Sequence, residues 1–252
     1  MPSLRDITGN WFSDPLLVIA DKQLRGASHI NKFGHNTCIA GCTQEDIWDN
    51  GSTYIYPTQA RIHDLTSASC NDTACGTGAR TIRVMGLDEC YNEIEEDVTM
   101  AGTCASPTQK KYLRIYRMYV LTAGSNEGSV GKISATAQVD GTVTAVILED
   151  NGNQTHMAIY TVPNGKTGYI TQIYGSIGRK QSASYSLDLK IRPLGGVFNT
   201  NFTIDGNSTG NSKVIYEPKP YIIVPAKSDI KISADSSLAG ADMTAGFDLI
   251  LL

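Results

Sequence analysis

The feature that most constrains the fold of this chain is a two-residue alternation of apolar and polar side chains, repeated in short runs. Residues 79–103 show it most clearly: Ile82 and Val84 alternate with other residues, and after turn residues 88–92 the alternation resumes at Ile94. Successive side chains of a strand point to opposite faces, so this period is typical of a strand buried on one face. We therefore expect two antiparallel strands joined by a tight turn.

The same alternation continues to the C-terminus and predicts an all-β protein. A cluster of turn residues at 150–153, Asp-Asn-Gly-Asn, divides it into two series. Residues 61–149 carry enough predicted strands for a β-sandwich of immunoglobulin-like size. Residues 150–252 are expected to form a second antiparallel β-sandwich related to a jelly roll. Residues 1–60 are expected to precede both as an extended N-terminal arm and a cysteine-rich docking segment.

Two details of the second series can be predicted from single turns. Ala158–Val162 and Gly168–Tyr174 read as adjacent strands, because Pro-Asn-Gly-Lys between them is a good turn sequence. Pro218 and Pro220 interrupt a later apolar run. Proline cannot donate to a strand ladder, so this part is expected at a sheet edge or at a crossing between sheets.

The N-terminal segment leaves more alternatives open. Leu16–Ile19 is a short apolar run that we interpret as a strand, and residues 1–34 either dock along another subunit or add a strand to the chain's own sheet. The aromatic residues that follow either fill the core of their own domain or anchor a contact between subunits, where aromatic side chains carry much of the binding energy. The interface candidates are Phe33, Trp48, Tyr54 and Tyr56.

Charge and hydropathy exclude several classes of partner. The 252 residues carry a formal net charge of −4, which argues against a broad electrostatic contact with nucleic acid. The basic group Lys110, Lys111, Arg114 and Arg117 is interpreted as the solvated face of a strand. No run of about 18 apolar residues predicts a membrane span, and no secretory signal peptide is visible. The protein is expected to be made in a cytoplasm.

Cysteine usage is uneven along the chain. All six lie in the first 104 residues, and their spacing fits free thiols, disulfides formed after assembly or release, or a zinc site. We favour disulfides, within or between chains, because the surrounding loops are rich in turn residues. A metal cluster of His35 with the first two cysteines is a further alternative, but no metal site is predicted. The disulfide candidates are Cys38, Cys42, Cys70, Cys75, Cys90 and Cys104.

No catalytic signature stands out in the chain. The acidic run between residues 88 and 97 has carboxylates of the kind used by glycosidases or for calcium binding. Strand alternation places Glu93, Glu95 and Asp97 on one face and Glu96 on the other, which favours a solvated outer face. No serine-histidine-aspartate order, phosphate-binding glycine loop or HExxH motif occurs. We therefore expect a protein that is not an enzyme and needs no cofactor.

Several segments after residue 30 resemble a family of virion structural proteins of tailed bacteriophages. The resemblance rests on sequence patterns that contain no catalytic motif and extend over most of residues 31–252. They are KFG…EDIWD…GSTY…P within 31–58, IRVMGLDECYNEIEEDVTMAG at 82–102, MAIYTVP at 157–163, IRPLGGVF at 191–198 and the ending AGFDLILL. The family pattern usually lacks the first four cysteines, which therefore look like an addition that cross-links the assembled particle.

The resemblance implies a non-enzymatic component of the virion that is made in the host cytoplasm. The expected form is an oligomeric, often trimeric, capsid decoration or cement protein in contact with the major capsid protein. A neck, collar or tail-fibre protein is the alternative within the same class. A module that binds a receptor or a carbohydrate is the contrasting hypothesis, with Tyr169, Tyr174, Tyr185 or Tyr221 as the sugar-stacking candidates.

Overall fold

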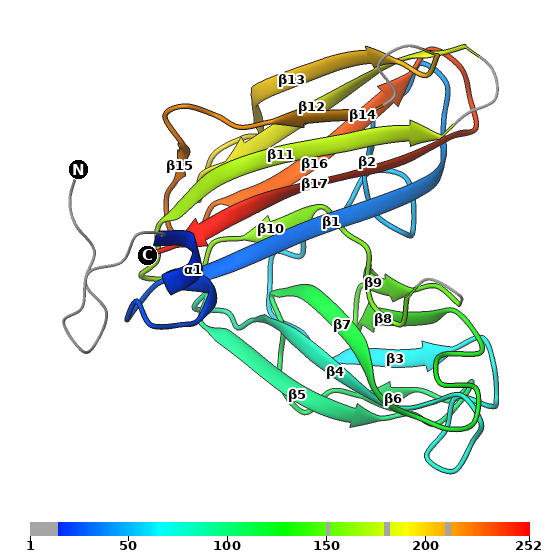
Figure 1. Cartoon of the computed structure of the whole chain (residues 1–252). Helices are drawn as coiled ribbons and strands as arrows, with labels where there is room; N and C mark the ends of the chain where they lie inside the picture. The colour runs from blue at the N-terminus through cyan, green and yellow to red at the C-terminus, as the bar shows by residue number, and fades with distance from the viewer. Residues whose placement is uncertain (1–14, 150–151, 179–181, 210–212) are drawn as a thin grey trace.

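The computed structural model of the chain describes residues 15–149, 152–178, 182–209 and 213–252. Within these residues the regular secondary structure is almost wholly β-strand, with one short helix, α1 (Pro15–Ala20). The strands form two β-sandwiches that lie side by side (Figure 1). All pairings between the named strands are antiparallel, so the predicted all-β sandwich architecture is confirmed.

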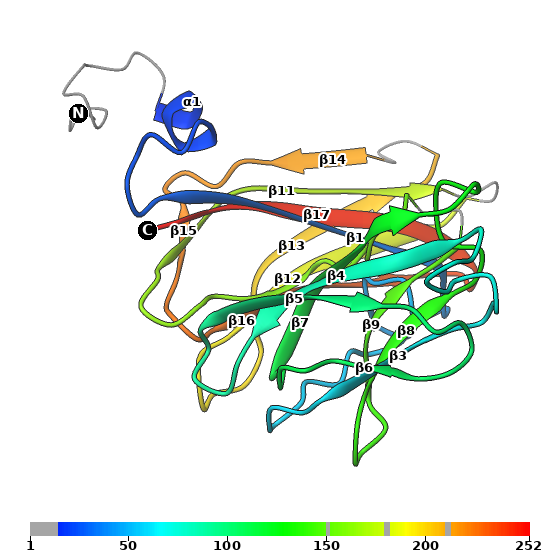
Figure 2. The ribbon, with the colours of Figure 1, turned by 90° about the horizontal axis from the view of Figure 1, so that it is seen from below.

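The second sandwich contains two five-stranded sheets. One has the order β1-β17-β11-β14, with β15 also beside β11; its strands are β1 (Ser28–Ile39), β17 (Ala241–Leu251), β11 (Gly168–Gly178), β14 (Lys213–Tyr216) and β15 (Ile222–Val224). The other has the order β10-β16-β12-β13, with β2 also beside β16; its strands are β10 (Ile159–Thr161), β16 (Asp229–Ser236), β12 (Ser184–Arg192), β13 (Asn199–Asn207) and β2 (Glu45–Asp46). Figure 2 shows the two layers from a second direction.

The first sandwich is smaller. A four-stranded sheet of order β6-β3-β8-β9 is formed by β6 (Ser106–Pro107), β3 (His63–Ser67), β8 (Ile133–Ala137) and β9 (Val143–Ile147). A three-stranded sheet of order β5-β4-β7 is formed by β5 (Glu93–Thr99), β4 (Ala79–Leu87) and β7 (Arg114–Ala123). The hairpin predicted within residues 79–103 is β4 and β5, which pair with Ile82 opposite Val98.

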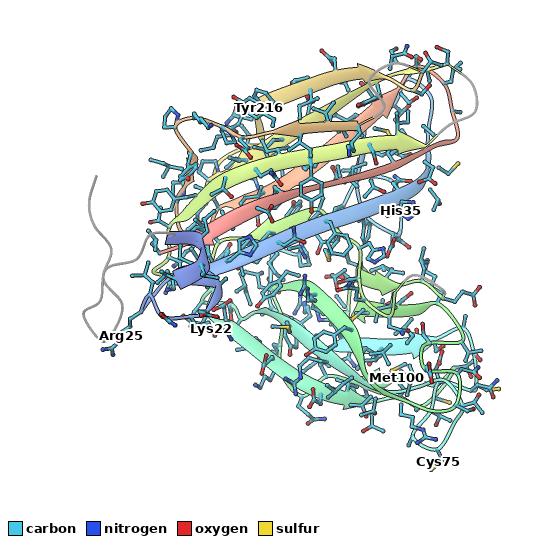
Figure 3. The ribbon with its side chains drawn as sticks, in the orientation of Figure 1. Lys22, Arg25, His35, Cys75, Met100 and Tyr216 are labelled. Carbon is cyan, nitrogen blue, oxygen red and sulfur yellow. The ribbon has the colours of Figure 1, made fainter. Side chains whose placement is uncertain are left out.

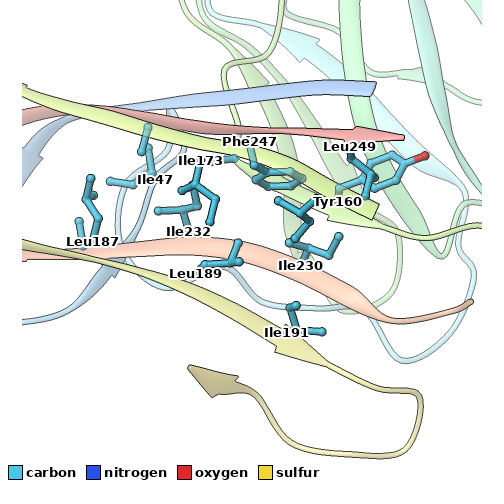
Figure 4. Packing of buried hydrophobic residues seen from close by; sticks show 14 of the residues in the cluster. Ile47, Tyr160, Ile173, Leu187, Leu189, Ile191, Ile230, Ile232, Phe247 and Leu249 are labelled. Carbon is cyan, nitrogen blue, oxygen red and sulfur yellow. The ribbon is translucent and has the colours of Figure 1, made fainter. Parts of the chain in front are cut away.

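The core of the second sandwich lies between its two sheets. Alternation along β12 sends Leu187, Leu189 and Ile191 inward, as the period of the sequence predicts. They belong to the same buried cluster as Phe247 and Ile173 of the facing sheet (Figure 4). Phe247 is fully buried. Burying a side chain of this size stabilises the fold by roughly 1.5–3 kcal/mol, so this apolar layer is what holds the two sheets together.

A separate cluster fills the first sandwich. Its members come from both sheets of that unit and include Ile82, Val84, Ile115, Ile133 and Leu65, all 1% exposed or less. Each sandwich therefore has an apolar cluster of its own, and Leu87 and Tyr116 of the first sandwich pack into the cluster of the second.

The strand β1 belongs to the second sandwich, which differs from the expected division at residue 60. It pairs with β17 from Ser28 opposite Leu251 to Ile39 opposite Ala241. The short strand β2 joins the other sheet of the same unit. Much of the predicted docking segment is thus internal, because β1 adds its backbone groups to the β17 ladder. The first sandwich is an insertion between β2 and β10. Residues 1–14 of the predicted arm and positions 150–151 of the predicted boundary lie outside the described residues.

The prediction that the strands around the 163–166 turn are adjacent is wrong. The turn exists, with the Lys166 amide donating to the Pro163 carbonyl at 3.3 Å. However, β10 pairs with β16 and β11 pairs with β17, so the turn carries the chain from one sheet to the other. The reason is competition for partners, since both edges of β11 are occupied, one by β17 and the other by β14 and β15.

Leu16–Ile19 is helical and not the strand that we expected. Its α-helix begins at Pro15, and proline is favoured at the first helical position because its missing N–H needs no partner there. Among the described residues, no helix has the length and apolar character needed to cross a membrane.

Candidate interaction surface

The four aromatic residues predicted as interface anchors are engaged inside the chain. Trp48 and Tyr54 are each 3% exposed, and their rings meet edge to face with centroids 5.0 Å apart. Tyr56 continues the row, with its ring centroid 4.8 Å from that of Tyr54. The Phe33 ring lies 5.0 Å from the ring of His156. The burial of Trp48 and Tyr54 supports the first of the two roles left open, filling the chain's own core, whereas Phe33 and Tyr56 are half-buried.

A buried ionic cluster joins the two sandwiches. Arg114 of β7 donates through Nε to Oδ1 of Asp229 on β16 at 3.1 Å, and both side chains are 7% exposed or less. The other carboxylate oxygen of Asp229 accepts from Arg192 Nε at 3.0 Å. The Thr161 hydroxyl donates to Oδ1 at 2.6 Å, and Arg114 also donates to the Pro57 carbonyl at 2.6 Å. We call Arg114, Asp229, Arg192 and Thr161 the junction cluster.

The ring of Tyr56 lies against both arginines of the junction cluster. The guanidinium carbons of Arg114 and Arg192 lie 5.1 and 4.5 Å from its centroid, which is the range of cation–π contacts. Burial raises the pKa of the Tyr56 hydroxyl well above its usual value, and the charge of Asp229 adds to this. Tyr56 is therefore a neutral ring beside the two cations and one anion of the junction cluster, in which Arg114 and Asp229 are buried and Arg192 is 27% exposed.

Our sequence interpretation of Arg114 as part of a solvated strand face is wrong. The β4–β7 pairing shifts register between Met85 and Gly86, and a shift of this kind breaks the simple inside–outside alternation. As a result both Arg114 and Ile115 are buried. The only signal in the sequence was an arginine inside an otherwise apolar run, which does not identify its partner.

A second buried cation ties β1 to the first sandwich. Lys32 is 3% exposed and its ammonium donates to the Tyr116 carbonyl. Burial lowers the pKa of the Lys32 ammonium, and the nearby charge of Arg117 lowers it further. Arg117 itself donates to the Asn31 carbonyl at 3.3 Å. Together with the junction cluster, these contacts fix how the two sandwiches sit against each other.

The six cysteines are free and exposed, and no disulfide links any of the described residues. Three of them gather at one end of the first sandwich, because the loop after β3 packs on residues 100–104: the Gly102 amide donates to the Asp72 carbonyl, and the Ala74 amide donates to the Met100 carbonyl. Figure 3 shows Cys75 at that end. These three are Cys70, Cys75 and Cys104. Cys38 and Cys42 flank the end of β1, and Cys90 lies in the β4–β5 turn. Exposed thiols at the ends of both sandwiches are accessible to another chain.

The acidic run forms an outer strand face, as predicted. Arg83 of β4 forms ion pairs with Asp97 and with Glu95, the latter at 3.4 Å. The hydrogen bond from Arg83 lowers the pKa of the Asp97 carboxyl. Glu96 points the other way and accepts the backbone amides of Gln109 and Lys110 at 2.7 and 3.0 Å. Glu95, Glu96 and Asp97 therefore each have a partner within the chain.

A groove with a partly apolar lining lies where α1 meets the β1-β17-β11 sheet. The groove has a volume of about 400 Å³ and is lined by Leu16 and Ile19 of α1 and by Tyr221 and Ile250 of the sheet side. In Figure 2, α1 lies beyond the outer side of this sheet. We define the α1–β15 surface by its exposed apolar residues, which are 50–63% exposed: Leu16, Leu17, Tyr221 and Ile223.

Strand register builds the sheet side of this surface. Ile223 lies opposite Tyr169, Tyr169 lies opposite Ile250, and Ile250 lies opposite His29, so four strands contribute one row of residues. Next to this row, the Asn31 amide donates to Asp248 Oδ1 at 2.7 Å and to the Tyr174 hydroxyl at 3.0 Å. An apolar area bordered by satisfied polar groups is the usual anatomy of a protein interface.

The tyrosines considered for sugar stacking are distributed over different environments. Tyr185 is buried at 3% exposure, and the hydroxyl of Tyr174 is held by Asn31. Burial raises the pKa of both hydroxyls. Of the four, only Tyr221 is half exposed and lines the groove.

Comparison of the sequence with protein-family models and with curated proteins finds no match.

Proposed function

We propose that this protein is a non-enzymatic structural component of a tailed-phage virion, and that it acts as an oligomeric capsid decoration protein. A neck, collar or tail-fibre position is the alternative within the same class. The proposal joins the resemblance of five segments to virion proteins with the way in which those segments pack.

The observation that carries the proposal is the convergence of the segments on one unit. Four of them supply β1, β2, β10, the end of β12 and β17, all in the second sandwich. Tyr56 from the first segment and Phe198 from IRPLGGVF lie on the same guanidinium, with Arg192 4.5 Å from each ring centroid. Tyr56 and Phe198, which are more than a hundred positions apart, thus pack against one side chain. Packing is the role expected of the motifs of a structural protein.

The α1–β15 surface is the proposed contact with a second copy of the chain. Its four large apolar side chains come from two segments far apart in sequence, and the Asn31–Asp248 hydrogen bonds border them. Burying one such side chain contributes roughly 1.5–3 kcal/mol. An oligomer formed through this surface would remove all four from water.

Introducing charge into this surface is expected to weaken self-association. In the double variant Leu16→Lys with Ile223→Lys, two exposed apolar anchors become cations that a partner would have to desolvate. Losing about 3 kcal/mol or more corresponds to an affinity lower by on the order of 100-fold. Size-exclusion chromatography with light scattering, over a range of concentrations, measures the change.

Val139→Lys is the matched control for that experiment. Val139 is 88% exposed and lies between β8 and β9 of the first sandwich, away from α1. The control is expected to keep the oligomeric state of the unmodified protein. An oligomer that persists in the double variant would exclude this surface as the contact.

Purified particles test the function itself. A decoration protein is expected in a copy number comparable to that of the major capsid protein, whereas a neck, collar or fibre protein would be far scarcer. Quantitative gel staining gives this ratio, and non-reducing lanes detect the proposed cross-links between exposed cysteines as bands larger than one chain. Absence of the protein from purified particles would overturn the proposal.

A further inference from the structure

Three polar side chains from separate segments meet beside the junction of the two sandwiches. They are His35 of β1, Asp49 after β2 and His156 before β10, and one nitrogen or oxygen atom from each lies within 4.8 Å of the others. Two hydrogen bonds join the last two residues: the Asp49 amide donates to the His156 carbonyl at 3.0 Å, and the His156 amide donates to the side-chain Oδ2 of Asp49 at 3.0 Å. Figure 3 shows the position of His35 on β1.

The three side chains are sheltered but not sealed off. Asp49 is 1% exposed, His156 is 14% exposed and His35 is 24% exposed. The Nδ1 atom of His156 lies 3.9 Å from Asp49 Oδ1. An ion could therefore enter from the His35 side and find a buried carboxylate at the far end of the cluster.

Two imidazoles and one carboxylate form a ligand set typical of divalent transition metals. Zinc binds histidine nitrogen and carboxylate oxygen, and imidazole also suits cobalt, nickel, copper and iron. Magnesium and calcium prefer sites made of oxygen ligands. The residue types therefore favour a zinc-like ion over the alkaline-earth ions.

Neighbouring side chains hold both imidazole rings in position, as metal-binding histidines require. Asp242 Oδ1 lies 2.6 Å from Nε2 of His35, and histidines that bind metals usually have such a carboxylate partner, which fixes the ring. The Phe33 ring, 5.0 Å from the His156 ring, packs beside the second imidazole.

We propose that His35, Asp49 and His156 form a binding site for one divalent transition-metal ion, with Asp242 as the group that positions His35. In a tetrahedral zinc site the ligand atoms lie roughly 3.3 Å apart. Binding therefore requires the three side chains to draw together by about an ångström. Water or a residue of a partner chain would complete the coordination.

Such an ion would act as a clip between elements that no covalent bond joins. It would join the edge strand β1 to two other segments of the chain. One follows β2, before the inserted first sandwich, and the other precedes β10, after it. Binding to the folded state alone raises stability by mass action, by about 2.7 kcal/mol at a free concentration one hundred times the dissociation constant.

The test uses the full chain with its six exposed cysteines alkylated, because thiolates also bind zinc. Isothermal titration with Zn²⁺ is expected to give one site per chain, and Zn²⁺ is expected to raise the melting temperature where Mg²⁺ does not. His35→Gln and His156→Gln are each expected to weaken binding by on the order of 100-fold, and Asp242→Asn by about 10-fold.

His29→Gln is the matched control, since His29 lies on the same strand, is 48% exposed and contacts Asp248 in place of the cluster. It is expected to bind Zn²⁺ as the unmodified chain does. Thermal unfolding without metal shows whether each variant is folded. If His156→Gln does not fold, the test rests on the variants His35→Gln and Asp242→Asn, whose side chains are more exposed. The proposal would be overturned if the unmodified chain showed no saturable Zn²⁺ binding. It would also be overturned if the folded variants at His35, His156 and Asp242 bound Zn²⁺ with unchanged affinity.

Discussion

Replacing Asp229 with alanine is expected to lower the free energy of unfolding by about 3–5 kcal/mol, the usual cost of removing one partner of a buried ion pair. The substitution leaves the guanidinium groups of Arg114 and Arg192 without the carboxylate that both of them contact. It also removes the acceptor of the Thr161 hydroxyl. Denaturant unfolding of the purified protein measures the loss.

The exposed pair of Arg83 and Asp97 provides the matched control. Asp97 also pairs with an arginine, but its side chain is 39% exposed, so Asp97→Ala is expected to cost about 1 kcal/mol at most. The contrast separates burial from pairing, because both substitutions remove an aspartate beside an arginine. Equal losses in the two variants would mean that the junction cluster does not hold the sandwiches together.

Replacing Asp72 with alanine is expected to have an effect of similar size within the first sandwich. Asp72 is fully buried, and its carboxylate accepts the backbone amides of Ala79, Val130 and Gly131 at 2.7, 3.0 and 3.1 Å. It also accepts the Ser67 hydroxyl at 2.5 Å. Hydrogen bonds to a charged group contribute roughly 1.5–3 kcal/mol each, and several buried donors would lose their acceptor. We expect a loss of about 3–5 kcal/mol on thermal or chemical unfolding.

Asp88→Ala is the control for that prediction. Asp88 lies in the β4–β5 turn and accepts the amides of Cys90 and Asn92 at 2.8 and 2.9 Å, but this turn is exposed. Water replaces the lost acceptor there, so the expected cost is about 1 kcal/mol. A loss for Asp72→Ala no greater than that of Asp88→Ala would show that the buried loop has other means of satisfying its donors.

Local pattern was a good guide to individual strands and a poor one to their partners. The alternation along β12 and the β4–β5 hairpin are present as the residues predict. Pro218 and Pro220 separate β14 from β15, which lie at the edge of their sheet. In contrast, the partner of β1 is more than two hundred residues away, and no local signal identifies it.

The two candidate sites were predictable to different degrees. The large aromatic residues stood out in the sequence, but Trp48 and Tyr54 proved to be buried, and the exposed surface contains Leu16 and Ile223 instead. His35, as a lone histidine before two cysteines, suggested a ligand set with those cysteines, whereas the structure places Asp49 and His156 beside it. Its neighbours in the structure are brought together only because β1 runs beside β17, while the chain re-enters the same sandwich at β10.

The residues by themselves determined many of the strands and the class of the fold, because period two, glycine, asparagine and proline act over a few neighbouring positions. Tertiary structure decided which strands share a sheet, that the first sandwich is an insertion, and that Arg114 is buried with Asp229. The physical reason is that strand pairing and ion pairing depend on distance in space, and in this chain some of the paired groups are more than two hundred residues apart in sequence.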